Sequence, residues 1–274
     1  MRSALAPLVL LAGCSAPPVA TPKPMGLPTL KNTLGITLVR LPGGEFSMGH
    51  ARSRGPVHRV RVSPFAIAAC EVTNRQYERL VPGHRRTKES PGDDDPAVGI
   101  PLREAKAFAA LLSKREGRLY RLPTDAEWEY AARGGLEGKD FPWGDERTGR
   151  RMNTGSLKAT KVGSYPPNAF GLYDMAGNAG EWILDTEFEF RPEVADAIVT
   201  DPLYLDKEPG GALYRGSTFN FDLPVVWLAF VALDDPDPES FSDVGIRLVL
   251  DEDGKAPRPI LPPQAGGGSE TGPW

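Results

Sequence analysis

The fold is decided by the stretch from residue 121 to residue 135, which reads RLPTDAEWEYAARGG. Thr124 stands three residues before Glu127, and this spacing forms a capping box in which a helix begins. Gly134 can adopt the left-handed backbone conformation that ends a helix. Between these signals lies Trp128, a large aromatic side chain that we expect to be buried in the core.

The helix and strand signals on either side of this stretch are short. A second capping box, from Thr73 to Gln76, predicts a helix that includes Tyr77 and Leu80. A further helix is predicted from Pro101, as its first residue, to Gly117. Strands are expected over Thr37 to Leu41, Val57 to Val62, Phe65 to Ala69 and Gly245 to Leu250, with turn-rich chain from Phe141 to Asp185. This pattern is typical of an α+β fold with much irregular chain.

The amino-acid composition excludes several classes of protein. The 274 residues are 40% hydrophobic and 25% charged, which is enough apolar chain for a sizeable core. The 30 glycines and 28 prolines exclude long helices or coiled coils as the main architecture. A net charge of −4 gives no electrostatic reason to expect a nucleic-acid partner. Two cysteines exclude a disulfide framework and a four-thiolate zinc site.

Several motifs stand in order around the 121–135 stretch. They are GGEFSMG at 43–49, EVTNRQY at 71–77, PWGD at 142–145, Asn153, VGSYPPN at 162–168, GLYDMAGN at 171–178 with Glu181-Trp182, YRGS at 214–217 and VGIRL at 244–248. The ordered set resembles the formylglycine-generating-enzyme domain family, also called sulfatase-modifying factors, over about residues 36–250. The resemblance implies a loop-rich variant of the C-type lectin fold, with short strands and a few short helices.

Active members of that family oxidise a substrate cysteine with copper held by two thiolates, the soft ligands that Cu(I) requires. Aligning their active segment on residues 215–219 places Phe221 and Val226 where the two cysteines would stand, and no cysteine follows Cys70. We therefore expect no copper, no catalytic residue and a degenerate member of the family. Cys70 lies in an apolar strand, so a small buried side chain is favoured there over a catalytic substitute.

The resemblance also implies a calcium site in the turn Asn178-Ala179-Gly180-Glu181, where relatives bind the ion through side-chain oxygens and backbone carbonyls. The alternative is that Asn178 caps the turn and Glu181 pairs with an arginine, with no metal. A second calcium site of the family, near Asn153, lacks an acidic partner in this sequence. His50, His58 and His84 show no metal-ligand spacing.

A strongly apolar run from Leu223 to Leu233 stands where relatives carry several arginines. Its length and β-branched residues favour a buried strand. The alternative is that part of the run lines a surface groove that binds a partner.

The first residues read as a bacterial lipoprotein signal, in which an apolar stretch ends in Leu11-Ala12-Gly13-Cys14. The predicted organisation is a signal peptide at 1–13, a Pro-rich tether at 14–29, the family domain at 30–250 and a disordered Pro/Gly-rich tail at 251–274. Cys14 would then be lipidated and would anchor the chain in the membrane, and Ser15 in place of Asp favours the outer membrane. The alternative is an ordinary secretory signal in which Cys14 is incidental.

Three functions remain open from the sequence. The favoured one is a lipid-anchored envelope protein that uses the degenerate domain to bind a protein partner or as a structural subunit of an envelope complex. The second is an enzyme of divergent chemistry in the same family, such as one that matures a peptide or metabolite by oxidation in the periplasm. The third is a surface-displayed variable receptor.

Overall fold

The computed structural model describes residues 23–52, 56–186, 198–205, 211–221, 229–233, 242–252 and 259–260. Cys14, Val226, the predicted signal peptide and most of the predicted tail lie outside the described residues. Within the described part of the chain, no helix has the length and apolar character needed to cross a bilayer.

A five-stranded antiparallel sheet forms the centre of the molecule. Its order is β1 (Thr29–Lys31), β2 (Thr37–Leu41), β5 (Phe65–Ala68), β13 (Val249–Asp251) and β6 (Leu119–Arg121). All four residues of β5 are buried, with Phe65 and Ile67 in one apolar cluster and Ala66 and Ala68 in another. Because side chains alternate along a strand, both faces of this sheet are covered.

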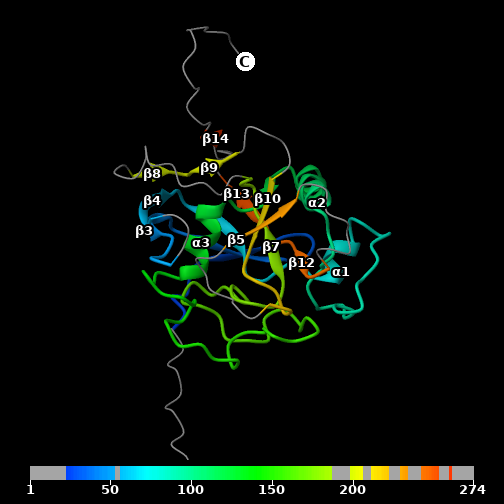
Figure 1. Cartoon of the computed structure of the whole chain (residues 1–274). Coiled ribbons are helices and arrows are strands. Elements are labelled where there is room, and N and C mark those ends of the chain that lie inside the picture. The colour runs from blue at the N-terminus through cyan, green and yellow to red at the C-terminus, as the bar shows by residue number, and fades with distance from the viewer. Residues whose placement is uncertain are drawn as a thin grey trace, which may run out of the picture.

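Three helices pack around the sheet. Helices α1 (Asn74–Glu78) and α2 (Leu102–Glu116) contribute to the cluster with Ala66 and Ala68, whereas α3 (Asp125–Arg133) contributes to the cluster with Phe65 and Ile67. Figure 1 shows α1 and α2 on one side of the molecule and α3 on the other. Both predicted capping boxes are present, and Gly117 and Gly134 end their helices in the left-handed conformation. Pro101 precedes its helix instead of beginning it.

The remaining strands form smaller sheets. The four-stranded sheet has the order β11 (Ala229–Leu233), β10 (Gly211–Arg215), β7 (Gly180–Trp182) and β12 (Val244–Gly245). A three-stranded sheet holds β3 (Gly44–Met48), β4 (His58–Val62) and β8 (Val199–Thr200), and β9 (Leu203–Tyr204) pairs with β14 (Pro259–Ile260). The four-stranded sheet carries the residues that the sequence marks as functional.

Two strand predictions need correction. The predicted strand from Gly245 to Leu250 is wrong, because its two ends belong to β12 and β13 in different sheets. Between them the chain turns Arg247 into the interior, where the side chain is fully buried. The predicted turn-rich region also contains a short strand, β7, at Gly180–Trp182. The strand predicted from the apolar run is confirmed for 229–233, which pairs with β10, and residues 223–228 lie outside the described chain.

Candidate binding site at the Arg215 turn

The candidate site is the turn that follows β10. Arg215 ends the strand opposite Glu181 of β7, and Gly216 and Ser217 turn the chain with φ angles of +92° and +60°. A Cβ atom on Gly216 would lie 3.3 Å from Cζ2 of Trp128, so glycine lets the backbone pass close to the indole. Ser217 holds a conformation that side-chain-bearing residues rarely adopt, as is common at functional turns.

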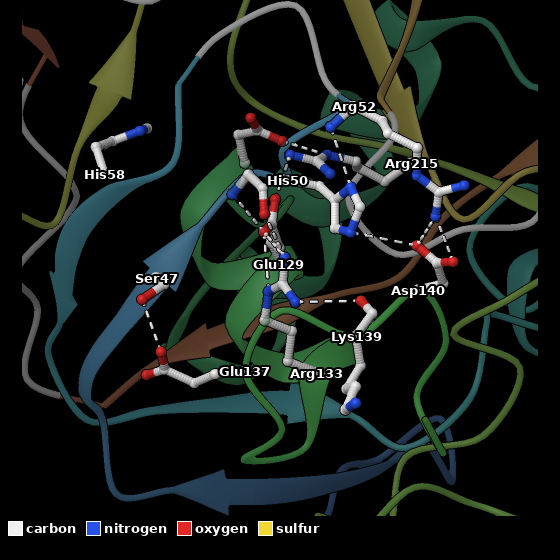
Figure 2. Close-up of polar contacts among 12 residues, drawn as sticks. Ser47, His50, Arg52, His58, Glu129, Arg133, Glu137, Lys139, Asp140 and Arg215 are labelled. Carbon is white, nitrogen blue, oxygen red and sulfur yellow. Dashed lines mark hydrogen bonds and ion pairs between the residues drawn. The ribbon is translucent and has the colours of Figure 1, made fainter. Parts of the chain in front are cut away.

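Two carboxylates of α3 hold the side chain of Arg215 in place. Its guanidinium donates hydrogen bonds to Asp125 and, over 3.1 Å, to Oε2 of Glu129. Glu129 also accepts from Arg133 at 2.7 Å and from the backbone N–H of Gly49 at 2.8 Å (Figure 2). Burial lowers the pKa of Arg215, but the charges of Asp125 and Glu129 outweigh it, and the net pKa is raised. Arg215 is therefore a fixed, charged support for the turn.

A second buried ion pair lies beside the first. Arg247 donates to both oxygens of Glu181, with Nη2 2.7 Å from Oε1 and Nε 2.8 Å from Oε2. The indole N–H of Trp128 donates to Oε2 of Glu181 at 2.6 Å. All three side chains are fully buried, which confirms the burial predicted for Trp128. Glu181 is thus the junction between α3, β7 and the segment that links β12 to β13.

A group of acids surrounds Arg247 on its other side. Oε2 of Glu71 lies 3.9 Å from Nη2 of Arg247 and has no hydrogen-bond partner among the described residues. Burial raises the pKa of Glu71 well above its usual value, and the nearby charge of Asp174 raises it further. Arg247 faces the buried carboxylates of Glu71, Asp174 and Glu181. Burial and the neighbouring negative charge therefore both favour the neutral form of Glu71.

The four residues of the predicted calcium site lie at the start of β7, and their side chains already have partners. Oδ1 of Asn178 accepts from the backbone N–H of Thr160 at 2.9 Å and from Nδ2 of Asn153 at 3.2 Å. Its Nδ2 donates to Glu71 at 2.9 Å. Gly180 pairs with Val244 in the β7–β12 ladder.

Calcium needs six to eight oxygen ligands, and all three side-chain oxygens of Asn178 and Glu181 already accept hydrogen bonds from protein groups. Glu181 is bound by Arg247 and Trp128, which is the arrangement of the metal-free alternative. Ala179 is buried and adds no side-chain oxygen. As placed, these residues do not fit a calcium ion, and calcium at Asn178, Ala179, Gly180 and Glu181 stays a prediction from the family resemblance alone.

The residues at the turn do not fit copper. Phe221 offers a partly exposed ring, with 46% of its surface accessible, and the chain has neither cysteine nor methionine after Met175. Cys70 ends up beside the buried acids, where burial and then the charge of Glu71 raise the pKa of its thiol to about 12. A thiol with this pKa is protonated at neutral pH, so it is a poor metal ligand and nucleophile.

The outer face of the turn is joined to the loop at 154–157. The backbone N–H of Ser156 donates to the carbonyl of Phe219 at 2.7 Å, and the hydroxyl of Thr154 donates to the carbonyl of Phe221. Next to Ser156, Leu157 has 84% of its surface exposed. Sequence reasoning missed Leu157, because only the folded chain brings its loop to the place where the family's cysteines would stand.

The three histidines lie in different surroundings. Nε2 of His50 lies 3.5 Å from Oδ1 of Asp140, which also pairs with Arg52 (Figure 2). His84 packs its ring against Tyr77, 4.8 Å between centroids, in another part of the molecule. Among the described residues, no three His, Cys, Asp or Glu side chains are grouped as a metal site would require.

Comparison with known proteins places the chain in a family. A family model for the sulfatase-modifying factor enzyme 1-like domain matches residues 27–252. The formylglycine-generating enzyme of Streptomyces coelicolor is 34% identical over 247 residues, covering 64% of this chain and 76% of that protein. The inactive C-alpha-formylglycine-generating enzyme 2 of Bos taurus is 29% identical over 256 residues, covering 68% of this chain and 82% of that protein.

Among solved structures, PvdO from Pseudomonas aeruginosa aligns with a TM-score of 0.71 and 26% identity, covering 82% of this chain and 98% of PvdO. The loop-rich fold of short strands and few short helices predicted from the sequence is thereby confirmed as formylglycine-generating-enzyme-like. The chain belongs to the sulfatase-modifying factor enzyme 1-like family.

Proposed function

We propose that this protein is a lipid-anchored envelope protein whose domain binds a protein partner and does not carry out the copper-dependent oxidation of the family. The observation that carries the proposal is the absence of a cysteine pair, because Cys70 is the single cysteine after Cys14. Burial also raises the pKa of the Cys70 thiol to about 12, which disfavours a thiolate at neutral pH.

Partner binding is supported by the outer face of the Arg215 turn. Leu157 is 84% exposed, and its loop is hydrogen bonded to the segment that ends at Phe221. Leu157 and Phe221 are two exposed apolar side chains on this face, and a bound partner would cover both. The inactive formylglycine-generating-enzyme relative in Bos taurus supports a member of the family without the reaction.

The partner-binding part is tested by crosslinking in intact cells followed by mass spectrometry of proteins attached to the purified chain. Leu157→Glu places a charge on the proposed contact surface, and we expect it to remove the crosslinked partner. The matched control is Leu111→Glu, a half-exposed leucine on α2, which should leave the crosslinks unchanged. Equal crosslinking by wild type and Leu157→Glu would contradict this surface.

The anchor is tested by fractionation. Cys14→Ala should release the protein from membranes into the soluble fraction, whereas Ser15→Ala should leave it in the outer membrane. Metabolic labelling with a clickable fatty acid should mark the wild type and miss Cys14→Ala. Labelling that persists in Cys14→Ala would contradict lipidation at this residue.

A further inference from the structure

We propose that a pocket beside α1, remote in sequence from the Arg215 turn, binds a phosphate monoester. The pocket has a volume of about 400 Å³ and lies between the turn that joins β1 to β2, the start of α1 and the loop at 161–162. It shares no lining residue with the Arg215 turn, so this binding goes beyond the proposed partner contact.

The lining is strongly cationic. Four basic side chains surround the pocket, against one carboxylate; the basic ones are Lys31, Arg75, Arg79 and Lys161. The carboxylate, Asp94, is shared between Arg75 and Lys161, each 3.3 Å away. Arg75 also pairs with Asp93 at 3.1 Å on the rim. Two of the four cations are therefore already balanced by acids of the protein.

Lys31 and Arg79 are the two cations left over, because neither makes an ion pair within the described ranges of the chain. They come from different elements, since Lys31 ends β1 and Arg79 follows α1. Arg79 stands four residues after Arg75, so both guanidiniums lie on one side of the helical turn. The fold thus brings together two unbalanced positive charges at one pocket.

A phosphate monoester matches this arrangement in charge and in size. It carries close to two negative charges at neutral pH, and its oxygens accept hydrogen bonds from both guanidinium and ammonium groups. The pocket is larger than a phosphate ion, and Leu34 and Val162 give it apolar wall for the body of an ester. Thr73 and Gln76 use their side-chain oxygens as acceptors in the capping box of α1, which leaves their O–H and NH2 groups as donors at the pocket.

Isothermal titration of the detergent-solubilised, full-length protein with glycerol 3-phosphate and with glucose 1-phosphate tests the proposal. We expect saturable binding that weakens as salt is raised. The double variant Lys31→Gln/Arg79→Gln should bind at least about tenfold more weakly, a loss of about 1.4 kcal/mol. The matched control is Lys106→Gln/Arg115→Gln, two exposed cations of α2 that do not line the pocket, and it should bind like wild type.

Two sources of the monoester are separated by a vesicle arm. Flotation with phosphatidylcholine vesicles that contain phosphatidic acid, using Cys14→Ala so that no acyl chain contributes, reports a lipid headgroup. Titration with the free esters reports a soluble ligand, and a loss caused by Lys31→Gln/Arg79→Gln in either arm supports the proposal. Absence of binding in both arms, equal losses in the control variant, or equally tight binding of succinate would overturn it. Because the pocket and the Arg215 turn have separate variants, this failure is distinguishable from failure of partner binding.

Discussion

The charged residues beneath the Arg215 turn and the residues on its outer face are held in different ways. Beneath the turn, Arg215 and Arg247 are buried and paired with carboxylates from α3 and β7. On the outer face, Phe221 and Leu157 are exposed, and the segment is held by backbone hydrogen bonds. The buried charge network therefore supports the shape of the fold, whereas the outer face is joined to that fold by hydrogen bonds to its backbone.

The largest expected effect comes from breaking the buried network. Glu181→Ala leaves Arg247 buried without its carboxylate and removes the acceptor of the Trp128 indole N–H. We expect it to lower the free energy of unfolding by ~3–5 kcal/mol, measured in urea melts. Most of this loss comes from the unpaired charge of Arg247. The double variant Glu181→Ala/Arg247→Met should therefore recover part of the lost free energy of unfolding. A single-variant loss below ~1 kcal/mol would show that the network does not support the fold.

A smaller effect on stability is expected when pH changes the ionisation of Asp185, which lies next to Asp125. Asp185 accepts backbone hydrogen bonds from Asp125 at 2.7 Å and from Tyr204 at 2.8 Å. Burial, and then the charge of Asp125, raises the pKa of Asp185 to about 8. A raised folded-state pKa means that the folded protein holds a proton that the unfolded chain has lost. Stability from this group is therefore full at low pH and is lost as pH rises towards about 8.

We expect the wild type to lose ~1–3 kcal/mol of unfolding free energy between about pH 5 and about pH 8. Asp185→Asn cannot ionise, so its stability should change less over the same pH range, although its NH2 group cannot accept and one of the two hydrogen bonds is lost. Urea melts of both proteins across this range provide the measurement. Parallel pH profiles for the two would contradict the assignment to Asp185.

Substitution on the outer face should matter least for stability. Phe221→Ser removes a half-exposed ring whose backbone hydrogen bonds remain, so we expect a loss below ~1 kcal/mol in the same melts. A small loss for Phe221→Ser and a large loss for Glu181→Ala would show that the buried charge network stabilises the fold and the outer face of the turn does not. A loss as large as that of Glu181→Ala would instead make Phe221 part of the structural core.

Calcium is expected to have no effect. With Asn178 and Glu181 already bonded to protein groups, added calcium should leave the melting temperature where a chelator leaves it. A clear rise on adding calcium would show that these side chains exchange their partners for the ion, as the family resemblance implies.

Local signals in the sequence predicted much of the fold. Thr73, Thr124 and Gly117 act on neighbouring backbone, so helix ends at these residues could be read directly. The strand predicted over 245–250 failed because its apolar pattern does not reveal that Arg247 turns inward between two sheets. Short strands such as β7 escape prediction because a few residues show too little periodicity.

The site was harder to predict because its partners are distant in sequence. Arg247 lies 66 residues from Glu181, and Arg215 lies 86 residues from Glu129. The sequence offered both a calcium site and an arginine pair for Glu181, and it could not show that Arg247 is the arginine that reaches this carboxylate. The absence of any cysteine after Cys70, in contrast, was visible directly, because it depends on residue identity alone.

We infer that the domain keeps the family's fold and lacks its cysteine oxidation. The most direct measurement is mass spectrometry of a sulfatase-type cysteine peptide after aerobic incubation with the purified protein and Cu(I). We expect an unchanged peptide and no tight Cu(I) binding, since the turn offers no sulfur ligand. Conversion of the peptide cysteine to formylglycine, persisting in Cys70→Ser, would contradict it.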